Sequence, residues 1–215
     1  MEFKDYSIDK FIEELSSSMP SPGGGSTAAL VAALATSLNS MVYSITIGKK
    51  AFERLNSEEK ARMILMSEES KELTDKLQKF MEQDRKDFLN LMDSFKLKKE
   101  TEKQKEIRKD AIKENTIKAM KTPLLLGEEA LKYYSNIEFA IKYGNKNLIS
   151  DAGVAAILLN ASIESAILNV KINLNSLRED EEYNNVLDRC NNILMKSEKI
   201  KNLLLKEVNN AIYPE

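Results

Sequence analysis

The chemistry open to this chain is limited first by a residue type that it lacks. Its 215 residues include no His and a single Cys, Cys190. These counts exclude Ser-His-Asp and Cys-His nucleophile systems, imidazole acid–base catalysis and nearly all zinc sites. If the protein is an enzyme, Asp, Glu, Lys or Tyr must move its protons. We therefore expect no metal and no cofactor, and we interpret Cys190 as structural.

A proline- and glycine-rich segment precedes the most apolar stretch of the chain. Its sequence is Pro20-Ser21-Pro22-Gly23-Gly24-Gly25-Ser26. Glycines allow backbone conformations closed to other residues, so consecutive N–H groups can converge on an anion, helped by the positive end of the next helix. We predict that this segment contacts a ligand. The alternative is a linker in which Ser26 or Thr27 only caps the helix.

A carboxylate interrupts an apolar stripe further along the chain. The stripe has helical spacing and consists of Leu73, Leu77, Phe80, Phe88, Leu91 and Phe95. Asp84 takes the stripe position between Phe80 and Phe88, and Asp87 lies one turn away on a nearby face. A carboxylate on an apolar face is costly unless it is paired or functional. Asp84 is therefore a candidate functional residue, and a buried ion pair to Lys or Arg is the alternative.

Uncharged polar side chains recur every three or four residues in another predicted helix. They are Ser162, Ser165, Asn169, Asn173 and Ser176. Such a face can hydrogen-bond a heterocyclic ligand or a partner helix, and the pattern leaves both open. Lys49 and Lys50 follow the apolar stretch, where the helix dipole ordinarily explains Lys. Asp151 can likewise be only a helix cap.

The candidate residues fall on predicted helices or at helix ends. Seven Gly, four Pro and no alternating strand pattern favour long helices. The predicted helices cover residues 8–17, 26–47, 57–95, 104–143, 150–177 and 181–211. Pro123 marks either a kink or a new helix start. The second helix is rich in small residues that let neighbours approach, so we predict one all-α domain over residues 1–215, a bundle of long helices around this Ala-rich helix.

Composition and charge narrow the class of protein further. Hydrophobic residues make up 42% and charged residues 31%, as in soluble globular proteins. The net charge of −2 argues against nucleic-acid binding. The N-terminus lacks the features of a signal peptide, and polar residues such as Asn39 interrupt the apolar stretch. We expect a cytoplasmic protein without a nucleic-acid or membrane partner.

Four groups of motif residues follow one another along nearly the whole chain. They are Pro20-Ser21-Pro22-Gly23-Gly24-Gly25-Ser26 with Thr46-Ile47-Gly48-Lys49-Lys50, Asp84-x-x-Asp87-Phe88, Ser150-Asp151-Ala152-Gly153-Val154-Ala155-Ala156, and Asn169-Val170-Lys171-Ile172-Asn173-Leu174. In combination they resemble the formiminotetrahydrofolate cyclodeaminase and methenyltetrahydrofolate cyclohydrolase family, which includes the C-terminal domain of formiminotransferase-cyclodeaminase. The resemblance implies an all-α fold, a homodimer and a folate substrate.

The resemblance implies two activities at the carbon that joins N5 and N10 of tetrahydrofolate. In the cyclohydrolase reaction, water attacks this carbon of the methenyl cation and a ring C–N bond opens. In the cyclodeaminase reaction, N10 attacks the formimino carbon and ammonia leaves. The chain has no room for a formiminotransferase domain, which favours a stand-alone cyclohydrolase. The cyclodeaminase is the alternative, and a non-catalytic helical scaffold is a more distant one.

The resemblance also implies roles for the motif residues. Asp84 would stand beside the cationic amidine as a catalytic carboxylate, Lys49 would donate or relay protons, and Asp151 would support them. We expect the other motif residues to bind substrate: Gly23, Gly24, Gly25, Ser26, Lys50, Asp87, Asn169, Lys171 and Asn173. Asp151 and Asn169 are roughly 27 Å apart on one straight helix. Either they hold opposite ends of a ligand, or a dimer partner brings one across, or one is structural.

Overall fold

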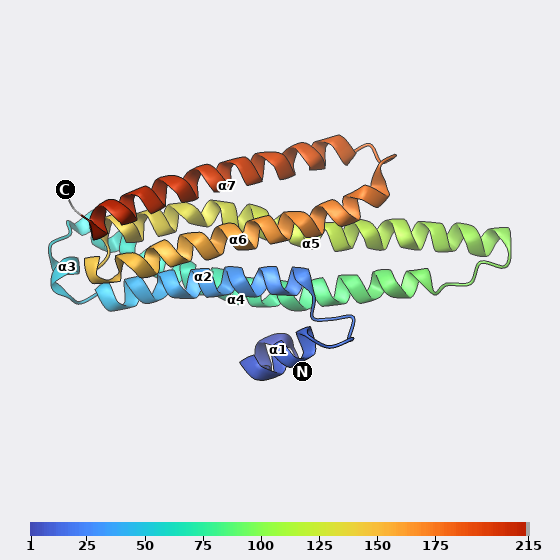
Figure 1. Cartoon of the computed structure of the whole chain (residues 1–215), viewed down its shortest axis with the longest axis horizontal. Coiled ribbons are helices and arrows are strands. Elements are labelled where there is room, and N and C mark those ends of the chain that lie inside the picture. Colours follow the sequence, from blue (N-terminus) through green and yellow to red (C-terminus); the bar gives the residue numbers. More distant parts are fainter. Residues whose placement is uncertain (214–215) are drawn as a thin grey trace.

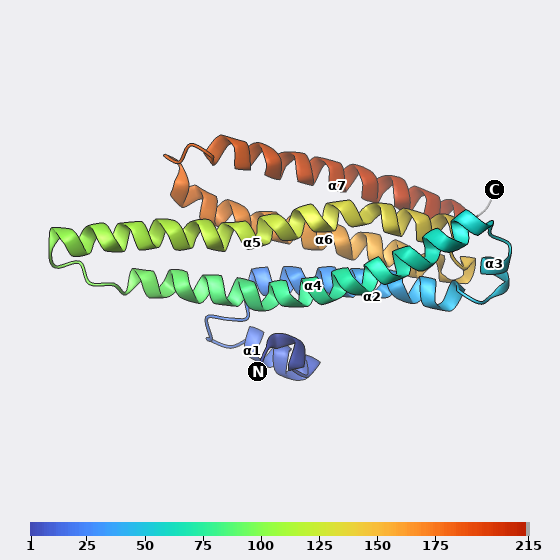
Figure 2. The same ribbon diagram turned by 180° about the vertical axis from the view of Figure 1, so that it is seen from behind.

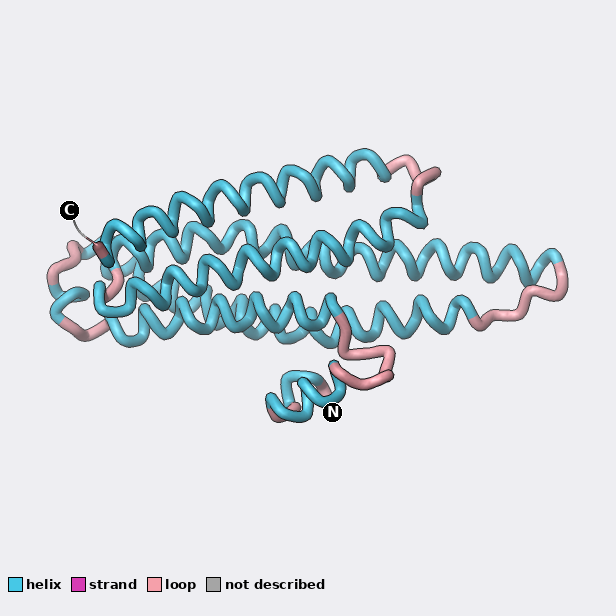
Figure 3. The backbone as a smooth tube through the Cα atoms, viewed as in Figure 1, coloured by secondary structure: helices cyan, strands magenta, loops and turns pink. Residues whose placement is uncertain are grey.

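A computed structural model describes residues 1–213, and every regular element in this range is a helix (Figures 1 and 3). The elements in chain order are η1 (Phe3–Asp5), α1 (Ile8–Leu15), α2 (Gly24–Thr46), α3 (Lys50–Glu53), α4 (Ser57–Phe95), α5 (Glu102–Tyr143), η2 (Lys146–Leu148), α6 (Ile149–Leu174), η3 (Asn175–Leu177) and α7 (Tyr183–Ile212). The prediction of an all-α bundle of long helices is confirmed.

The Ala-rich helix α2 lies at the centre of the bundle, packed along both α4 and α6. Its buried alanines are Ala28, Ala29, Ala32, Ala33 and Ala35, and their short side chains let both neighbours approach. Helix α5 packs on α4 and α6, and α7 covers α5 and α6. Figures 1 and 2 show that α4 and α5 extend past the other helices as a hairpin, and that α1 lies outside the bundle.

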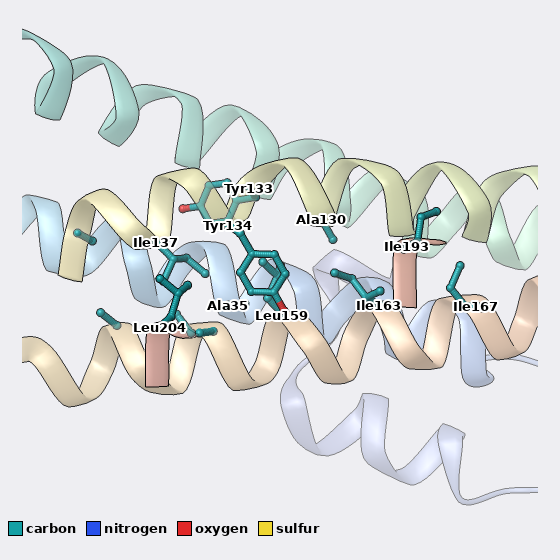
Figure 4. Close-up of a cluster of buried hydrophobic side chains, with 14 of the residues drawn as sticks. Ala35, Ala130, Tyr133, Tyr134, Ile137, Leu159, Ile163, Ile167, Ile193 and Leu204 are labelled. Atoms are coloured by element: carbon teal, nitrogen blue, oxygen red, sulfur yellow. The ribbon is translucent and has the colours of Figure 1, made fainter. Parts of the chain in front are cut away.

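The core lies where α2, α5, α6 and α7 meet (Figure 4). Leu159 and Ile163 of α6 are fully buried there, facing Ile137 of α5 and Ala35 of α2. Burying one such aliphatic side chain contributes about 1.5–3 kcal/mol to stability. This packing holds α2 and α6 in a fixed relation, which positions the side chains at their ends.

Three local predictions are corrected by the structure. Helix α2 begins at Gly24 with Gly23 as N-cap, so Ser26 is inside the first turn and caps nothing. Helix α6 begins at Ile149, and Asp151 lies in its first turn instead of at the cap. Helix α5 runs unbroken through Pro123, so of the two alternatives predicted for this residue, the new helix start is wrong. Tertiary contacts override the weak helix propensities of glycine and proline at these points.

Helices α2 and α6 are long and apolar enough, by length and composition alone, to cross a membrane. About half of each apolar window, 50% and 56%, is buried inside the bundle. The core helix of a soluble protein gives the same pattern, so the finding does not decide between the two. It does show that the other half of each window faces outward.

Candidate functional site

One cavity of about 480 Å³ is lined by six of the twelve site residues selected from the sequence. The start of α2 contributes the glycine segment, α4 contributes Asp84, and the end of α6 contributes Asn169 and Asn173. These segments are distant in sequence and meet only because α2 packs between α4 and α6. The size lies within the range usual for small-molecule sites.

Gly24 and Gly25 belong to helix α2 and leave space for neighbouring side chains, instead of forming a loop. A Cβ atom built on Gly25 would overlap the carboxylate of Asp84, and one on Gly24 would lie 3.3 Å from the side-chain amide of Asn169. Nothing lies within 4 Å of a Cβ built on Gly23. Because Gly24 and Gly25 have no side chains, Asp84 and Asn169 can approach the positive end of α2.

Asp84 is a partly buried carboxyl group whose protein partners are uncharged. The Ser26 hydroxyl lies 2.9 Å from Asp84 Oδ2 and 3.1 Å from the Met81 carbonyl, and its one proton can serve only one of them at a time. Burial raises the pKa of Asp84, the hydrogen bonds from Ser26 oppose this shift, and the nearby Asp87 adds to it. Residues 1–213 contain no salt bridge to Asp84, so the ion-pair alternative finds no support.

Asp87 points away from the cavity. Its side chain is 5% exposed, and its oxygens accept hydrogen bonds from Gln83 Nε2 at 2.8 Å and Thr122 Oγ1 at 2.7 Å. It does not line the cavity, so its predicted contact with substrate is not seen in the structure. Asp87 instead lies between α4 and α5, one turn from Asp84, as a buried carboxyl group held by neutral donors.

The polar stripe on α6 divides into two parts. Ser162 donates to the Ala28 carbonyl of α2 at 2.7 Å, which is helix packing. Asn169 and Asn173 line the cavity, and their Nδ2 groups donate to backbone carbonyls. Among residues 1–213 no group donates to either Oδ1. The helix-packing alternative therefore holds for Ser162, and the ligand alternative stays a prediction for Asn169 and Asn173.

The cationic candidates and Asp151 lie far from Asp84 within one chain. Helix α2 is about 35 Å long, and Lys49 and Lys50 are exposed just beyond its far end. Asp151 is in the first turn of α6, at that same end. Lys171 does not line the cavity and acts on the pKa of Cys190 in α7. The roles predicted for these residues stay predictions.

Several residues that shape the cavity were not selected as site residues from the sequence. Phe88 and Met92 of α4, Ala119 of α5 and Ile172 of α6 line it. Phe88 follows Asp84 by one helical turn, so its place on the same face was available from spacing. Ile172 is 69% exposed, and as an aliphatic residue in an apolar helix it gave no such signal.

Two further cavities lack this combination of groups. One of about 270 Å³ between α5 and α7 is mostly aliphatic, and one of about 450 Å³ lies between α4 and α5 beside Glu72 and Lys76. Neither contains a residue of the glycine segment or Asp84. In the described part of the chain, no three His, Cys, Asp or Glu side chains are grouped closely enough to hold a metal ion.

Comparison with known proteins gives consistent matches. Residues 7–192 match the family model described as formiminotransferase-cyclodeaminase. The methenyltetrahydrofolate cyclohydrolase of Methylorubrum extorquens is 35% identical over 79% of this chain and 80% of that protein. The formimidoyltransferase-cyclodeaminase of Rattus norvegicus is 30% identical over 94% of this chain. The chain spans only about a third of the rat protein, 36% of its length.

A solved structure has the same fold. The crystal structure of formiminotetrahydrofolate cyclodeaminase from Thermotoga maritima superposes with a TM-score of 0.85, covering 99% of this chain and 100% of that chain. The two sequences are 24% identical, so this match supports the helical architecture alone.

Proposed function

The chain belongs to the formiminotransferase-cyclodeaminase family, and from this premise we propose that it is a one-carbon folate enzyme acting at the carbon between N5 and N10. We propose 5,10-methenyltetrahydrofolate cyclohydrolase as the activity, because the Methylorubrum extorquens cyclohydrolase is a relative that this chain covers for 80% of its length. The second candidate is formiminotetrahydrofolate cyclodeaminase, which the similarity to the rat protein favours.

The observation that carries this proposal is a carboxyl group without a protein cation, standing in a small-molecule cavity. The methenyl substrate is itself a cation, so it would supply the positive charge that residues 1–213 do not place beside Asp84. Bringing that charge next to Asp84 would lower the pKa that burial has raised, because an opposite charge favours the ionised carboxyl. Substrate binding would thus produce the carboxylate that the reaction needs.

Asp84 can then act as the base for hydrolysis. Water adds to the bridging carbon while Asp84 accepts its proton, and a tetrahedral carbon bonded to N5, N10 and oxygen forms. Asp84 returns its proton to N5 as the N5–C bond breaks, and the hydroxyl group on the tetrahedral carbon loses its proton to solvent and becomes the carbonyl of the formyl group on N10. In the cyclodeaminase alternative, N10 attacks instead of water, and the same carboxyl would move protons between N10 and the leaving ammonia.

The rest of the cavity suits the folate ring system. Phe88 and Ile172 provide apolar surface, while Asn169 and Asn173 present side-chain oxygens as acceptors. Reduced pterin rings carry several N–H donors and flat apolar faces, so both kinds of surface have a counterpart in the ligand. We propose that Gly24, Gly25 and Ser26 support this site by admitting and hydrogen-bonding Asp84.

The first test compares the two reactions directly. We expect the purified protein to abolish the methenyl absorbance of 5,10-methenyltetrahydrofolate, without added metal or nicotinamide. Asp84→Asn should lower turnover about 10²-fold or more, the usual effect of losing a positioned acid–base group, while the fold remains. Glu138→Gln, an exposed change on α5, is the control.

The outcomes separate the candidates. Appearance of the methenyl absorbance from formiminotetrahydrofolate alone would establish the cyclodeaminase instead. No reaction with either compound, and no thermal shift with tetrahydrofolate derivatives, would leave a non-catalytic scaffold. Complete loss of activity after chelation, restored by one metal, would contradict the proposed metal independence.

We also propose a homodimer formed through the outer face of α2 and α6. These helices share one side of the bundle, and α4 and α5 occupy the opposite side (Figures 1 and 2). Six large aliphatic side chains on the two helices are more than a third exposed: Leu34, Ile45, Val154, Ile157, Leu168 and Ile172. A surface of this kind usually marks a protein interface.

A two-fold dimer through this face would bring the distant candidate residues to the cavity. We propose a two-fold axis perpendicular to α2 and α6, so that each helix runs antiparallel to its copy. Asp151 is two residues after the start of α6, and Ile172 is two residues before its end. Asp151 of the partner subunit would then lie near Ile172 at the cavity, and Lys49 of the partner subunit near the glycine segment.

Mixing two inactive variants tests this arrangement. If each site uses Asp84 of one subunit and Asp151 of the other, Asp84→Asn and Asp151→Asn homodimers should both be nearly inactive. Random re-association should restore about a quarter of the wild-type activity, since half the dimers are mixed and one of their two sites is intact. A monomer with full activity, or mixtures without recovery, would contradict the shared site.

The remaining assignments follow from this proposal. Lys50 and Lys171 would contact the anionic glutamate tail, Lys50 from the partner subunit. We propose a cytoplasmic enzyme that needs no cofactor besides its folate substrate and has no nucleic-acid or membrane partner.

A further inference from the structure

Pro123 removes one hydrogen bond from the interior of α5. An α-helical N–H donates to the carbonyl four residues earlier, and proline has no N–H. The carbonyl of Ala119 therefore loses its helical donor, although α5 continues without a break on both sides. Ala119 is buried and lines the cavity that contains Asp84. The vacant acceptor thus lies at the wall of the site.

Asn173 of α6 supplies the missing donor. Its Nδ2 group donates to the Ala119 carbonyl at 3.3 Å and to the Asn169 carbonyl at 2.9 Å. These two bonds use both hydrogens of the amino group, which fixes the orientation of the amide. Its Oδ1 is then the part left for a ligand, on a side chain that lines the cavity.

A neighbouring residue on α5 also serves the site. Thr122 donates to Asp87, whose carboxyl group helps to raise the pKa of Asp84. The stretch 119–123 therefore meets the cavity directly through the Ala119 carbonyl freed by proline, and acts on it indirectly through the Thr122 hydroxyl and Asp87. A regular helix in this position would offer only the hydroxyl.

We propose that Pro123 is a positioning residue, which frees the Ala119 carbonyl to orient Asn173 as a fixed acceptor for an N–H group of the bound substrate. Asn173 is accordingly a specificity-determining residue of the cavity. The inference rests on the proposed function for the identity of the substrate, but the Asn173–Ala119 bond exists independently of it. A purely structural proline would have no such connection to binding.

The variant Pro123→Ala tests the connection between Pro123 and substrate binding. If Pro123 served packing alone, this substitution would not affect binding. Alanine restores a helical N–H donor that competes with Asn173 for the Ala119 carbonyl, so only the bond to the Asn169 carbonyl still holds the amide firmly and its orientation becomes less fixed. We expect the free energy of unfolding to be unchanged or higher. KM should rise about tenfold, the scale of one misplaced hydrogen bond, while kcat should stay within about twofold of wild type. Glu138→Ala, an exposed position on the same helix, should change none of these.

A double-mutant cycle shows whether Pro123 acts through Asn173. Asn173→Ala should raise KM by a similar factor, and adding Pro123→Ala should raise it no further. Wild-type KM in Pro123→Ala, or additive effects in the double variant, would overturn the proposal. If Pro123→Ala does not fold, a wild-type KM in Asn173→Ala overturns it as well.

An NMR measurement on the ligand-free protein separates this inference from the proposed function. The side-chain amide signals of Asn173 should shift and exchange faster in Pro123→Ala than in wild type. Unchanged signals would refute the positioning role even if the enzyme is active. Shifted signals together with no turnover of either folate would refute the proposed function and leave the Asn173–Ala119 contact established.

Discussion

Two polar clusters in this bundle differ in where their unused hydrogen-bonding groups lie, one in the closed interior and the other at a cavity. The central cluster joins α2, α4 and α5 through Asn39, Ser70, Tyr133 and Asn136. Asn136 donates to the Met66 carbonyl at 3.0 Å and accepts from Asn39 Nδ2 at 2.7 Å. In the described residues, one buried side-chain atom there has no partner, Asn39 Oδ1. The Asp84 cavity, by contrast, leaves the Oδ1 atoms of Asn169 and Asn173 open.

The same desolvation has opposite chemical effects in the two clusters. Burial raises the pKa of Tyr133 to about 12 and that of Tyr43 higher still, so these phenols stay neutral and cannot exchange protons near pH 7. Burial also raises the pKa of Asp84, but from an acidic starting value, which moves it toward neutrality. Burying an acid thus prepares it for proton transfer, whereas burying a phenol makes it inert.

The largest expected effect comes from filling the space beside Asp84. Gly25→Ala places a methyl group where the Asp84 carboxylate lies, so turnover should fall about 10²-fold, as after loss of the carboxyl itself. Gly24→Ala meets Asn169 at 3.3 Å and should have a smaller effect, mainly on KM. Gly23→Ala meets nothing within 4 Å and is the matched control. Equal turnover in all three variants would show that the glycines do not position Asp84.

Substitutions in the central cluster should change the free energy of unfolding and leave turnover unchanged. Asn136→Leu removes one of two side-chain donors to the Met66 carbonyl and one of two acceptors of Asn39 Nδ2, which should cost about 1–3 kcal/mol of unfolding free energy. Turnover per folded molecule should stay normal. Urea unfolding and an activity assay on the same sample measure both, with the exposed Ser135→Ala as control. A loss of turnover at full stability would mean that this cluster belongs to the site.

A smaller, pH-dependent effect should distinguish Asp84 from its amide. Folding raises the pKa of Asp84 above its value in the unfolded chain, which is about 4. Below that pH the carboxyl group is neutral in the folded and the unfolded state alike. As the pH rises through the folded-state pKa, ionisation of Asp84 lowers the free energy of unfolding. The advantage of Asp84→Asn over wild type should therefore grow from pH 4 to pH 8. It should reach at most about 1.4 kcal/mol per unit of pKa difference. A difference that is flat or falls with pH would contradict the raised pKa.

Spacing along the sequence found the central parts of the site because helical periodicity is local. Asp84 stood out as a polar interruption of an apolar stripe, and Asn169 and Asn173 as members of a polar stripe. The structure places all three on one cavity. Asp87 follows Asp84 by three residues and so lies about 60° away around the helix. This offset turns it toward Thr122 of α5 instead of toward α2. Periodicity gives the face of a helix but not the neighbour that the face meets.

The sequence by itself determined the helical class, the family and the residues that could carry charge into the interior, because composition, period and short motifs are properties of the chain alone. Only the tertiary structure decided that Gly24 and Gly25 are helical and make room, that Asp84 has no salt bridge, and that Asn173 replaces the donor lost at Pro123. These facts depend on which helices touch, and α2, α4, α5 and α6 meet at the site from positions as much as about 150 residues apart.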